Sequence, residues 1–214
     1  MRRKRAGLVA VLMLQTLLMG CASAELEGNC FPLVVTIGEE DGNVTYCAGF
    51  PLVGSTEDEQ KNNEIRVGMT KGKTIAESKT TFESYLNKNA NYNHLKVLVF
   101  EDDLLENKVQ FSEVLSYLAK KECFPRNTYV CVVDDAEELL ELEKHLPQDL
   151  GTYLEEYLKN HEAQKNKLLT LGDLLNEKEN QMMILYLPYL EADDNYVKWI
   201  GYMNTEGKTW KESD

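Results

Sequence analysis

Apolar and polar positions near the start of the chain's main body predict two strands joined by a tight turn. Residues 31–53, FPLVVTIGEEDGNVTYCAGFPLV, are apolar on both sides of a polar centre. Asp41 and Gly42 lie at that centre, and an Asp-Gly pair is a strong signal for a type I′ hairpin turn. The turn sets the pairing of the two strands and places Thr36 opposite Cys47. We therefore predict an N-terminal β-hairpin in this register.

Two apolar strands with a helix between them predict a parallel crossover. The runs HLKVLVF, residues 94–100, and NTYVCVV, residues 127–133, are typical of buried strands. A strand, a helix and a second strand in this order form a right-handed parallel unit in almost all known cases. The helix is predicted by apolar residues at the i, i+3, i+4, i+7 and i+8 positions of one face, namely Phe111, Val114, Leu115, Leu118 and Ala119.

Helix-capping residues and further apolar runs complete the predicted architecture. Thr74 and Glu77 form a capping box for a helix that ends near Asn87. The fold class that we predict is mixed α/β, with a central mixed β-sheet, an N-terminal hairpin, one parallel βαβ crossover and several flanking helices. The remaining predicted elements are helices that begin near Asp134, Asp149 and Thr170, and two final strands over residues 182–190 and 195–203.

The first twenty residues predict an export signal. Four basic residues at positions 2–5 precede an apolar run over residues 6–20. This run is shorter than the roughly 20 apolar residues that a membrane-spanning helix needs, and its charged start is typical of a signal peptide. The segment ends in Leu18-Met19-Gly20-Cys21, which resembles a bacterial lipobox. In that pattern the cysteine sulfur receives a diacylglycerol and becomes the first residue of the mature protein.

Two alternatives to lipidation remain open. Ala22-Ser23-Ala24 resembles an ordinary secretory cleavage site, and cleavage there would remove Cys21. The third reading is an uncleaved anchor. Lipidation is our leading prediction. It gives a lipoprotein signal peptide over residues 1–20, a tether over residues 21–30 and a single α/β domain over residues 31–214, held at the extracytoplasmic side of a bacterial plasma membrane.

The balance of charge narrows the set of partners. The chain carries 23 basic and 36 acidic residues, for a formal net charge of −13. An acidic surface is repelled by the phosphate backbone of nucleic acids. We therefore predict no nucleic-acid partner.

The cysteines of the main body do not match a zinc site. Cys30 would lie opposite Val53 in the predicted hairpin, roughly 20 Å along the strands from Cys47, which is too far for a disulfide. Cys123 and Cys131 are close enough in sequence to form a disulfide, but nothing requires it. Buried free thiols are the simplest interpretation of all four.

Few patterns in the chain suggest catalysis. GMTKGKT, residues 68–74, is one residue shorter than a phosphate-binding P-loop, so we interpret it as a turn into a capped helix. HEAQK, residues 161–165, has lysine where a zinc-binding HExxH helix has its second histidine. His94 and His145 have no partner pattern. We predict no catalytic residue, no cofactor and no metal. Three aromatic residues near the C-terminal end either pack in the core or cover a partner surface: Tyr189, Trp199 and Trp210.

Several segments, in order, resemble one protein family. They are KGKTIAES, YNHLKVLVFEDDLLENK, RNTYVCVVDDAEELLE, LTLGDLLNE and LYLPYLEADDNYVKWIGYM. Together they resemble the Ger(x)C family, the lipoprotein C subunits of spore germinant receptors. The resemblance runs from about Phe31 to Gly201 and concerns the family's N-terminal domain only. Cys21 corresponds to the lipidated residue of the family.

The resemblance implies a non-enzymatic subunit of a nutrient germinant receptor that acts in spore germination, on the extracytoplasmic side of the spore inner membrane. Its implied partners are a polytopic A-like subunit, a membrane-embedded B-like subunit and the membrane itself through the lipid anchor. No germinant-binding residue follows from the resemblance. The alternative is a tethered extracytoplasmic solute-binding module, which would need a deep pocket with convergent polar groups. An envelope hydrolase is the weakest alternative, because it needs a nucleophile or metal set that the sequence does not present.

Overall fold

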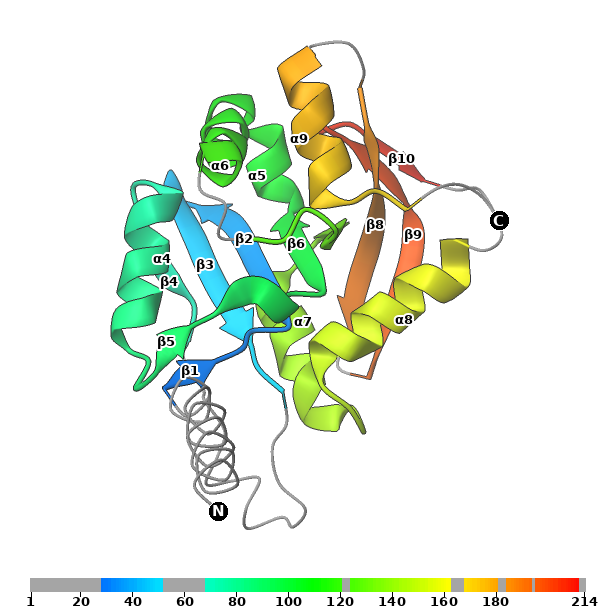
Figure 1. Cartoon of the computed structure of the whole chain (residues 1–214). Helices are drawn as coiled ribbons and strands as arrows, with labels where there is room; N and C mark the ends of the chain where they lie inside the picture. The colour runs from blue at the N-terminus through cyan, green and yellow to red at the C-terminus, as the bar shows by residue number, and fades with distance from the viewer. Residues whose placement is uncertain are drawn as a thin grey trace, which may run out of the picture.

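An eight-stranded mixed β-sheet lies at the centre of the described part of the chain (Figure 1). The computed structural model describes residues 28–51, 68–120, 124–162, 168–180, 184–193 and 195–211. Its strands are β1 (Asn29–Cys30), β2 (Val34–Glu40), β3 (Asn43–Gly49), β4 (Thr70–Gly72), β5 (Asn89–Ala90), β6 (Val97–Glu101), β7 (Tyr129–Val133), β8 (Tyr186–Asp193), β9 (Tyr196–Asn204) and β10 (Thr209–Lys211). The sheet has the order β10-β9-β8-β7-β6-β2-β3-β4, while β1 and β5 form a separate parallel pair.

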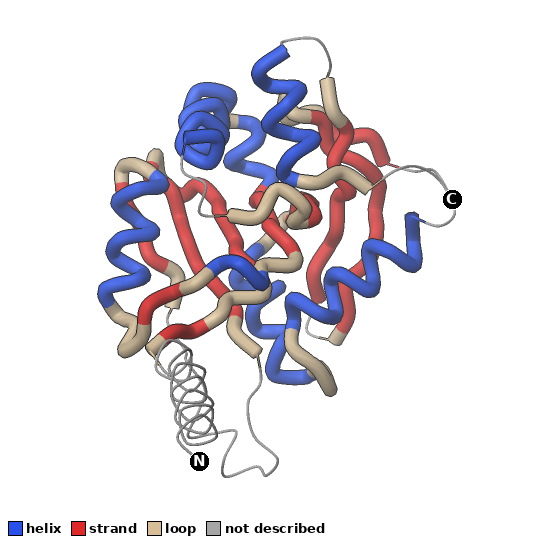
Figure 2. The backbone as a smooth tube through the Cα atoms, in the orientation of Figure 1, coloured by secondary structure: helices blue, strands red, loops and turns tan. Residues whose placement is uncertain are grey.

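Helices cover both faces of this sheet, as the blue helices on either side of the red strands show in Figure 2. The helices are α4 (Ile75–Ser84), α5 (Asp102–Glu106), α6 (Lys108–Lys120), α7 (Ala136–Leu142), α8 (Leu150–Glu162) and α9 (Leu171–Asn180), with short 3₁₀ helices η1 (Tyr92–His94) and η2 (Glu143–His145). Helices α4, α5, α6 and α9 pack on one face, which we call the α6 face. Helices α7 and α8 pack on the other, the α8 face.

The predicted hairpin is confirmed, with its turn and its register. Asp41 and Gly42 both have positive φ angles, 52° and 75°, as a type I′ turn requires. Thr36 pairs with Cys47 in the antiparallel ladder between β2 and β3. Because Gly42 carries no Cβ and Asp tolerates positive φ better than most residues, the local sequence selects this turn.

The predicted mixed α/β fold class is also confirmed. Strands β6 and β7 are parallel, and α6 lies between them in the chain, as expected for the crossover. The parallel part is larger than that single unit, since β2 pairs in parallel with β6 and β7 with β8. The larger extent escaped prediction because β2 and β8 are each also half of an antiparallel hairpin, and a local pattern reveals only the hairpin partner.

The predicted position of Cys30 is wrong. Cys30 is not part of the hairpin but lies in β1, where it pairs with Ala90 of β5. Pro32, two residues later, has no N–H to donate to a ladder, and the chain bends there before β2 begins. Val53, the predicted partner of Cys30, lies outside the described residues.

Several element boundaries differ from the prediction. The strand expected over residues 94–100 begins at Val97, because Tyr92–His94 form η1. Helix α4 ends at Ser84, three residues before the predicted Asn87. Helix α7 is capped by Asp135, whose carboxylate accepts the Glu138 N–H at 2.9 Å, and begins after Asp134. Strand β10 was not predicted.

Candidate interaction surfaces

The first described residues are fastened to one corner of the domain. The predicted lipidation residue, Cys21, lies outside the described residues, and the described chain begins at Gly28. The Asn89 N–H donates to the Gly28 carbonyl at 3.0 Å, and the Asn91 N–H donates to the Cys30 carbonyl at 2.8 Å. We call the region formed by β1, β5, η1 and the last turn of α4 the β1–β5 corner. The chain therefore enters the domain at this corner.

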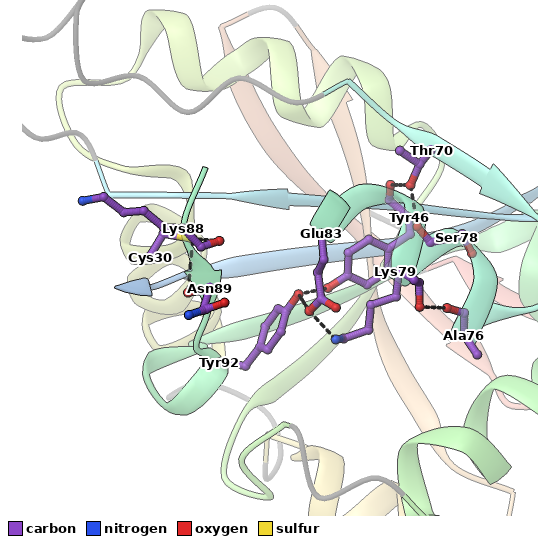
Figure 3. Close-up of polar contacts among 11 residues, drawn as sticks. Cys30, Tyr46, Thr70, Ala76, Ser78, Lys79, Glu83, Lys88, Asn89 and Tyr92 are labelled. Carbon is purple, nitrogen blue, oxygen red and sulfur yellow. Dashed lines mark hydrogen bonds and ion pairs between the residues drawn. The ribbon is translucent and has the colours of Figure 1, made fainter. Parts of the chain in front are cut away.

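A buried polar network holds this corner together (Figure 3). The Tyr46 hydroxyl of β3 donates to the Tyr92 hydroxyl of η1 at 3.0 Å, and the Tyr92 hydroxyl donates to the Glu83 carboxylate of α4 at 2.9 Å. Lys79 Nζ lies 2.5 Å from the same carboxylate and 4.7 Å from the centre of the Tyr92 ring. The Tyr92 hydroxyl thus links β3 to the Glu83 carboxylate, and the network joins β3, η1 and α4.

Because burying polar groups without partners is unfavourable, the network opposes movement of η1 away from α4. Lys79 is only 8% exposed, and a buried ammonium is tolerated only with a partner. Glu83 supplies the opposite charge, while the Tyr92 ring supplies its negative π face. Displacing η1 would remove a hydrogen bond from Glu83 and the ring from Lys79. The only signal in the sequence is the i, i+4 spacing of Lys79 and Glu83, since nothing marks the pairing of Tyr46 with Tyr92.

The described cysteines are protonated thiols. Cys30, Cys47 and Cys131 form no disulfide with one another, as predicted for the first two. Burial raises the pKa of Cys30, and it raises the pKa of Cys47 to about 11 and that of Cys131 to about 12. A thiol with so high a pKa is a poor nucleophile at neutral pH. Cys123, the other half of the possible Cys123–Cys131 disulfide, lies outside the described residues.

The Gly-Lys-Thr segment leads into a capped helix, as interpreted from the sequence. Residues 70–72 are strand β4, so the segment is an edge strand rather than only a turn. Thr74 Oγ1 accepts the Glu77 N–H at 3.3 Å, and the Glu77 carboxylate accepts the Lys73 N–H at 2.8 Å. The Lys73 N–H, which a bound phosphate would need as a donor, is therefore already hydrogen-bonded to the Glu77 carboxylate.

An aromatic cluster joins α8 to β9. The His161 ring stacks on Tyr157 with centroids 4.0 Å apart and lies 6.1 Å from Trp199, which meets Tyr202 edge to face. The backbone N–H of Trp199 donates to the Tyr157 hydroxyl oxygen at 2.8 Å. Strand β10 pairs only with Gly201–Met203 of β9, so this hydroxyl covers part of an otherwise open strand edge. Trp199 thus packs against its own domain.

The carboxyl end of strand β6 carries two partly buried acids. Glu101, at the end of β6, accepts the Ala136 N–H at 3.0 Å and the Thr45 hydroxyl at 3.3 Å. The next residue, Asp102, accepts the Tyr189 hydroxyl at 2.6 Å. Burial raises the pKa of both carboxyl groups and, together with Asp102, the pKa of Tyr189.

These acids have structural partners within the domain. Tyr189 is buried, so of the two roles considered for it, core packing is confirmed. The parallel strands lie in the order β2-β6-β7-β8, which follows the chain without reversing. Within the described strands there is consequently no switch point of the kind that binds ligands in open α/β sheets.

Two kinds of feature are absent from the described residues. No group of three or more His, Cys, Asp or Glu side chains in the described part of the chain is placed to hold a metal ion. Among the helices over the same residues, none combines the length and the apolar character needed to span a bilayer. His161, the first residue of the HEAQK segment, instead has its Nδ1 2.9 Å from the Tyr157 carbonyl oxygen, which accepts the hydrogen bond.

Comparison with known proteins identifies the family. Residues 23–192 match the family model described as the spore germination protein N-terminal domain. No curated protein and no solved structure matches the chain. The match covers most of the chain, including β1 to β8 with their helices and all but the last described residue of β8. This chain therefore belongs to the spore germination protein N-terminal domain family.

Proposed function

We propose that the chain is a non-enzymatic, lipid-anchored C-type subunit of a nutrient germinant receptor. The observation that carries this proposal is the family match, which begins at residue 23, two residues after Cys21 of the lipobox-like segment. An N-terminal cysteine modified with two or more acyl chains is held stably at a membrane, whereas a single chain binds only marginally. The domain would lie on the extracytoplasmic side.

The proposed role is to act through contacts with A-like and B-like membrane subunits. A lipid anchor confines the domain near the bilayer, which raises its effective concentration for partners in the same membrane. The fold supports such a role, because the raised pKa values of the described cysteines make them poor nucleophiles, and the partly buried Glu101 and Asp102 accept internal hydrogen bonds. The domain presents a rigid surface rather than a reactive one.

The anchor is tested with two matched leader variants expressed in a bacterium that processes lipoproteins. Cys21→Ser removes the acceptor sulfur, while Ala24→Leu disrupts the ordinary small-x-small cleavage site and keeps Cys21. We expect the unchanged chain and Ala24→Leu to fractionate with membranes as acylated proteins that begin at Cys21, and Cys21→Ser to lose the acyl mass. A soluble mature form that begins at Glu25 would refute the anchor.

The partners are tested by cross-linking in intact spore membranes. The proposal predicts that the acylated chain cross-links to polytopic proteins, and that Cys21→Ser, made at the same level, loses most of these products. Cross-links of equal yield in both forms would show that the anchor does not mediate assembly.

A further inference from the structure

We infer that the β1–β5 corner is the face that lies against the lipid headgroups of the bilayer. This inference rests on the proposed anchoring through Cys21. Seven residue steps separate Cys21 from Gly28, and a fully extended chain covers roughly 25 Å in that number of steps. A domain of this size is roughly 40 Å across. The tether is therefore too short for the end of the domain far from the corner to reach the bilayer.

The limit on the reach of the tether holds because Gly28 is hydrogen-bonded to the domain. If β1 were loose, the tether would be longer by the length of the unpaired strand. Instead the Gly28 and Cys30 carbonyls both accept hydrogen bonds from the β5 side, and Tyr92 is held in place by Glu83 and Tyr46. The corner is thus a fixed attachment point. In Figure 1, α6 lies at the opposite end of the molecule from β1 and β5.

The segments that form the corner are poorer in acidic residues than the chain as a whole. Residues 28–38 and 84–100 contain no Asp or Glu, although the chain carries 36 of them. Lys88 and His94 are exposed within this region. Glu27 and Glu83 directly precede these two segments, and the Glu83 carboxylate is paired with Lys79 at 2.5 Å. An anionic headgroup layer would repel this acid-poor face less than it repels the acidic remainder of the domain.

The exposed side chains of the corner suit the boundary between water and lipid. Tyr85, directly after α4, is 67% exposed. Phe31 and His94 meet edge to face with ring centres 5.1 Å apart. Aromatic rings with a polar end are favoured at the level of the headgroups, and nearby lysines favour anionic lipids. Tyr85 and Lys88 are therefore the residues that we expect to contact the headgroups.

The test places a fluorophore on the corner and at a control position. Tyr85→Cys and Val109→Cys are prepared in the acylated full chain, labelled with an environment-sensitive dye and reconstituted into vesicles that contain phosphatidylglycerol. Val109 is 72% exposed and is the second residue of α6. The unsubstituted chain, treated identically, gives the labelling of the native thiols. We expect a quencher attached to the lipid headgroup to act several-fold more strongly on the dye at position 85.

A pair of charge variants sharpens the result. Lys88→Glu and Lys108→Glu change the net charge equally, but only the first lies on the corner. A basic residue near an anionic surface contributes a factor of about five to binding. We expect Lys88→Glu to reduce the excess quenching at position 85 by about that factor, and Lys108→Glu to leave it unchanged.

Each outcome has a distinct meaning. Protein that does not float with the vesicles contradicts the anchor, and so the proposed function. Protein that floats but shows equal quenching at positions 85 and 109 overturns the orientation alone. The quenching at position 85 could instead be weak in vesicles that lack the A-like and B-like subunits, and the dye could be shielded only in membranes that contain them. That result would make the corner a protein interface and overturn the lipid assignment.

Discussion

The two faces of the sheet are stabilised in different ways. On the α8 face, the helices contribute an aliphatic layer that is fully buried, made of Leu139, Leu142, Leu150, Leu154 and Leu158. The α6 face is equally well buried but also contains the polar network of Lys79, Glu83, Tyr92 and Tyr46. The comparison indicates that the buried apolar layers of both faces supply stability, whereas the polar network on the α6 face also fixes the geometry of the corner where the chain enters.

The largest expected effect comes from breaking the aliphatic layer. Leu154→Ala removes a side chain with no solvent exposure, and the cavity should lower the free energy of unfolding by about 3 kcal/mol. Urea unfolding of the two proteins measures the difference. Val109→Ala, at a side chain that is 72% exposed, is the control and should change stability by less than about 0.5 kcal/mol. Equal effects of the two substitutions would contradict the assigned packing.

The polar network should be weakened by losing its charge. Glu83→Gln keeps an acceptor for the Tyr92 hydroxyl but leaves the Lys79 ammonium without an opposite charge, at a cost of about 2 kcal/mol. Lys79→Met added to Glu83→Gln should recover much of that loss, because no buried charge then remains. A double-mutant cycle with urea unfolding gives the coupling, and additive effects would show that the pair does not interact.

A smaller loss of stability is expected from a substitution at Gly38, which lies next to the Glu101 carboxylate. A Cβ added at Gly38 would lie 1.4 Å from Glu101 Oε2, so Gly38→Ala must displace that carboxylate from Thr45 and Ala136. We expect a loss of about 1 kcal/mol from these hydrogen bonds. In a Glu101→Ala background the same substitution should cost much less. An undiminished cost there would mean that the Glu101 carboxylate is not what Gly38 makes room for.

The smallest effect is a pH dependence with opposite signs at two carboxylates. Burial raises the pKa of Glu101 above its ordinary 4.5. Its favourable contribution is therefore present below pH 4.5 and is lost as the pH rises through the raised pKa. At Glu155, burial opposes the charged form, but hydrogen bonds from Lys159 and Lys96 outweigh it and lower the pKa. Its contribution is present above pH 4.5 and is lost as the pH falls through the lowered pKa.

Two amide variants separate these contributions. The stability of Glu101→Gln relative to the unchanged chain should increase as the pH rises above 4.5. The stability of Glu155→Gln relative to the unchanged chain should decrease as the pH rises from the lowered pKa of Glu155 to 4.5. Thermal unfolding across the acidic range measures both differences. Slopes of the same sign would contradict the environments assigned to the two side chains.

Local patterns predicted the parts of the fold that local interactions determine. The Asp41-Gly42 turn dictated its hairpin, and the spacing of Phe111, Val114, Leu115 and Leu118 identified α6 and its buried side. The helix predicted to begin near Asp149 is α8, and its leucines are buried.

Contacts between distant segments escaped prediction. Strand β1 forms because Asn29 and Cys30 meet Asn89 and Ala90, and two-residue strands carry no pattern of their own. The hydroxyls of Tyr46 and Tyr92 meet across 46 positions of sequence. The β1–β5 corner, which carries the orientation that we infer, was therefore visible only once the chain was folded.

Isolation of the acylated chain from spore membranes tests the central claim most directly. The chain carries an affinity tag after Asp214, is extracted in mild detergent and is analysed by mass spectrometry. Membership of a germinant receptor predicts that two membrane-embedded proteins, one of them polytopic, are recovered in constant proportion to the tagged chain. Recovery of the chain alone, from membranes in which both proteins are present, would contradict the account.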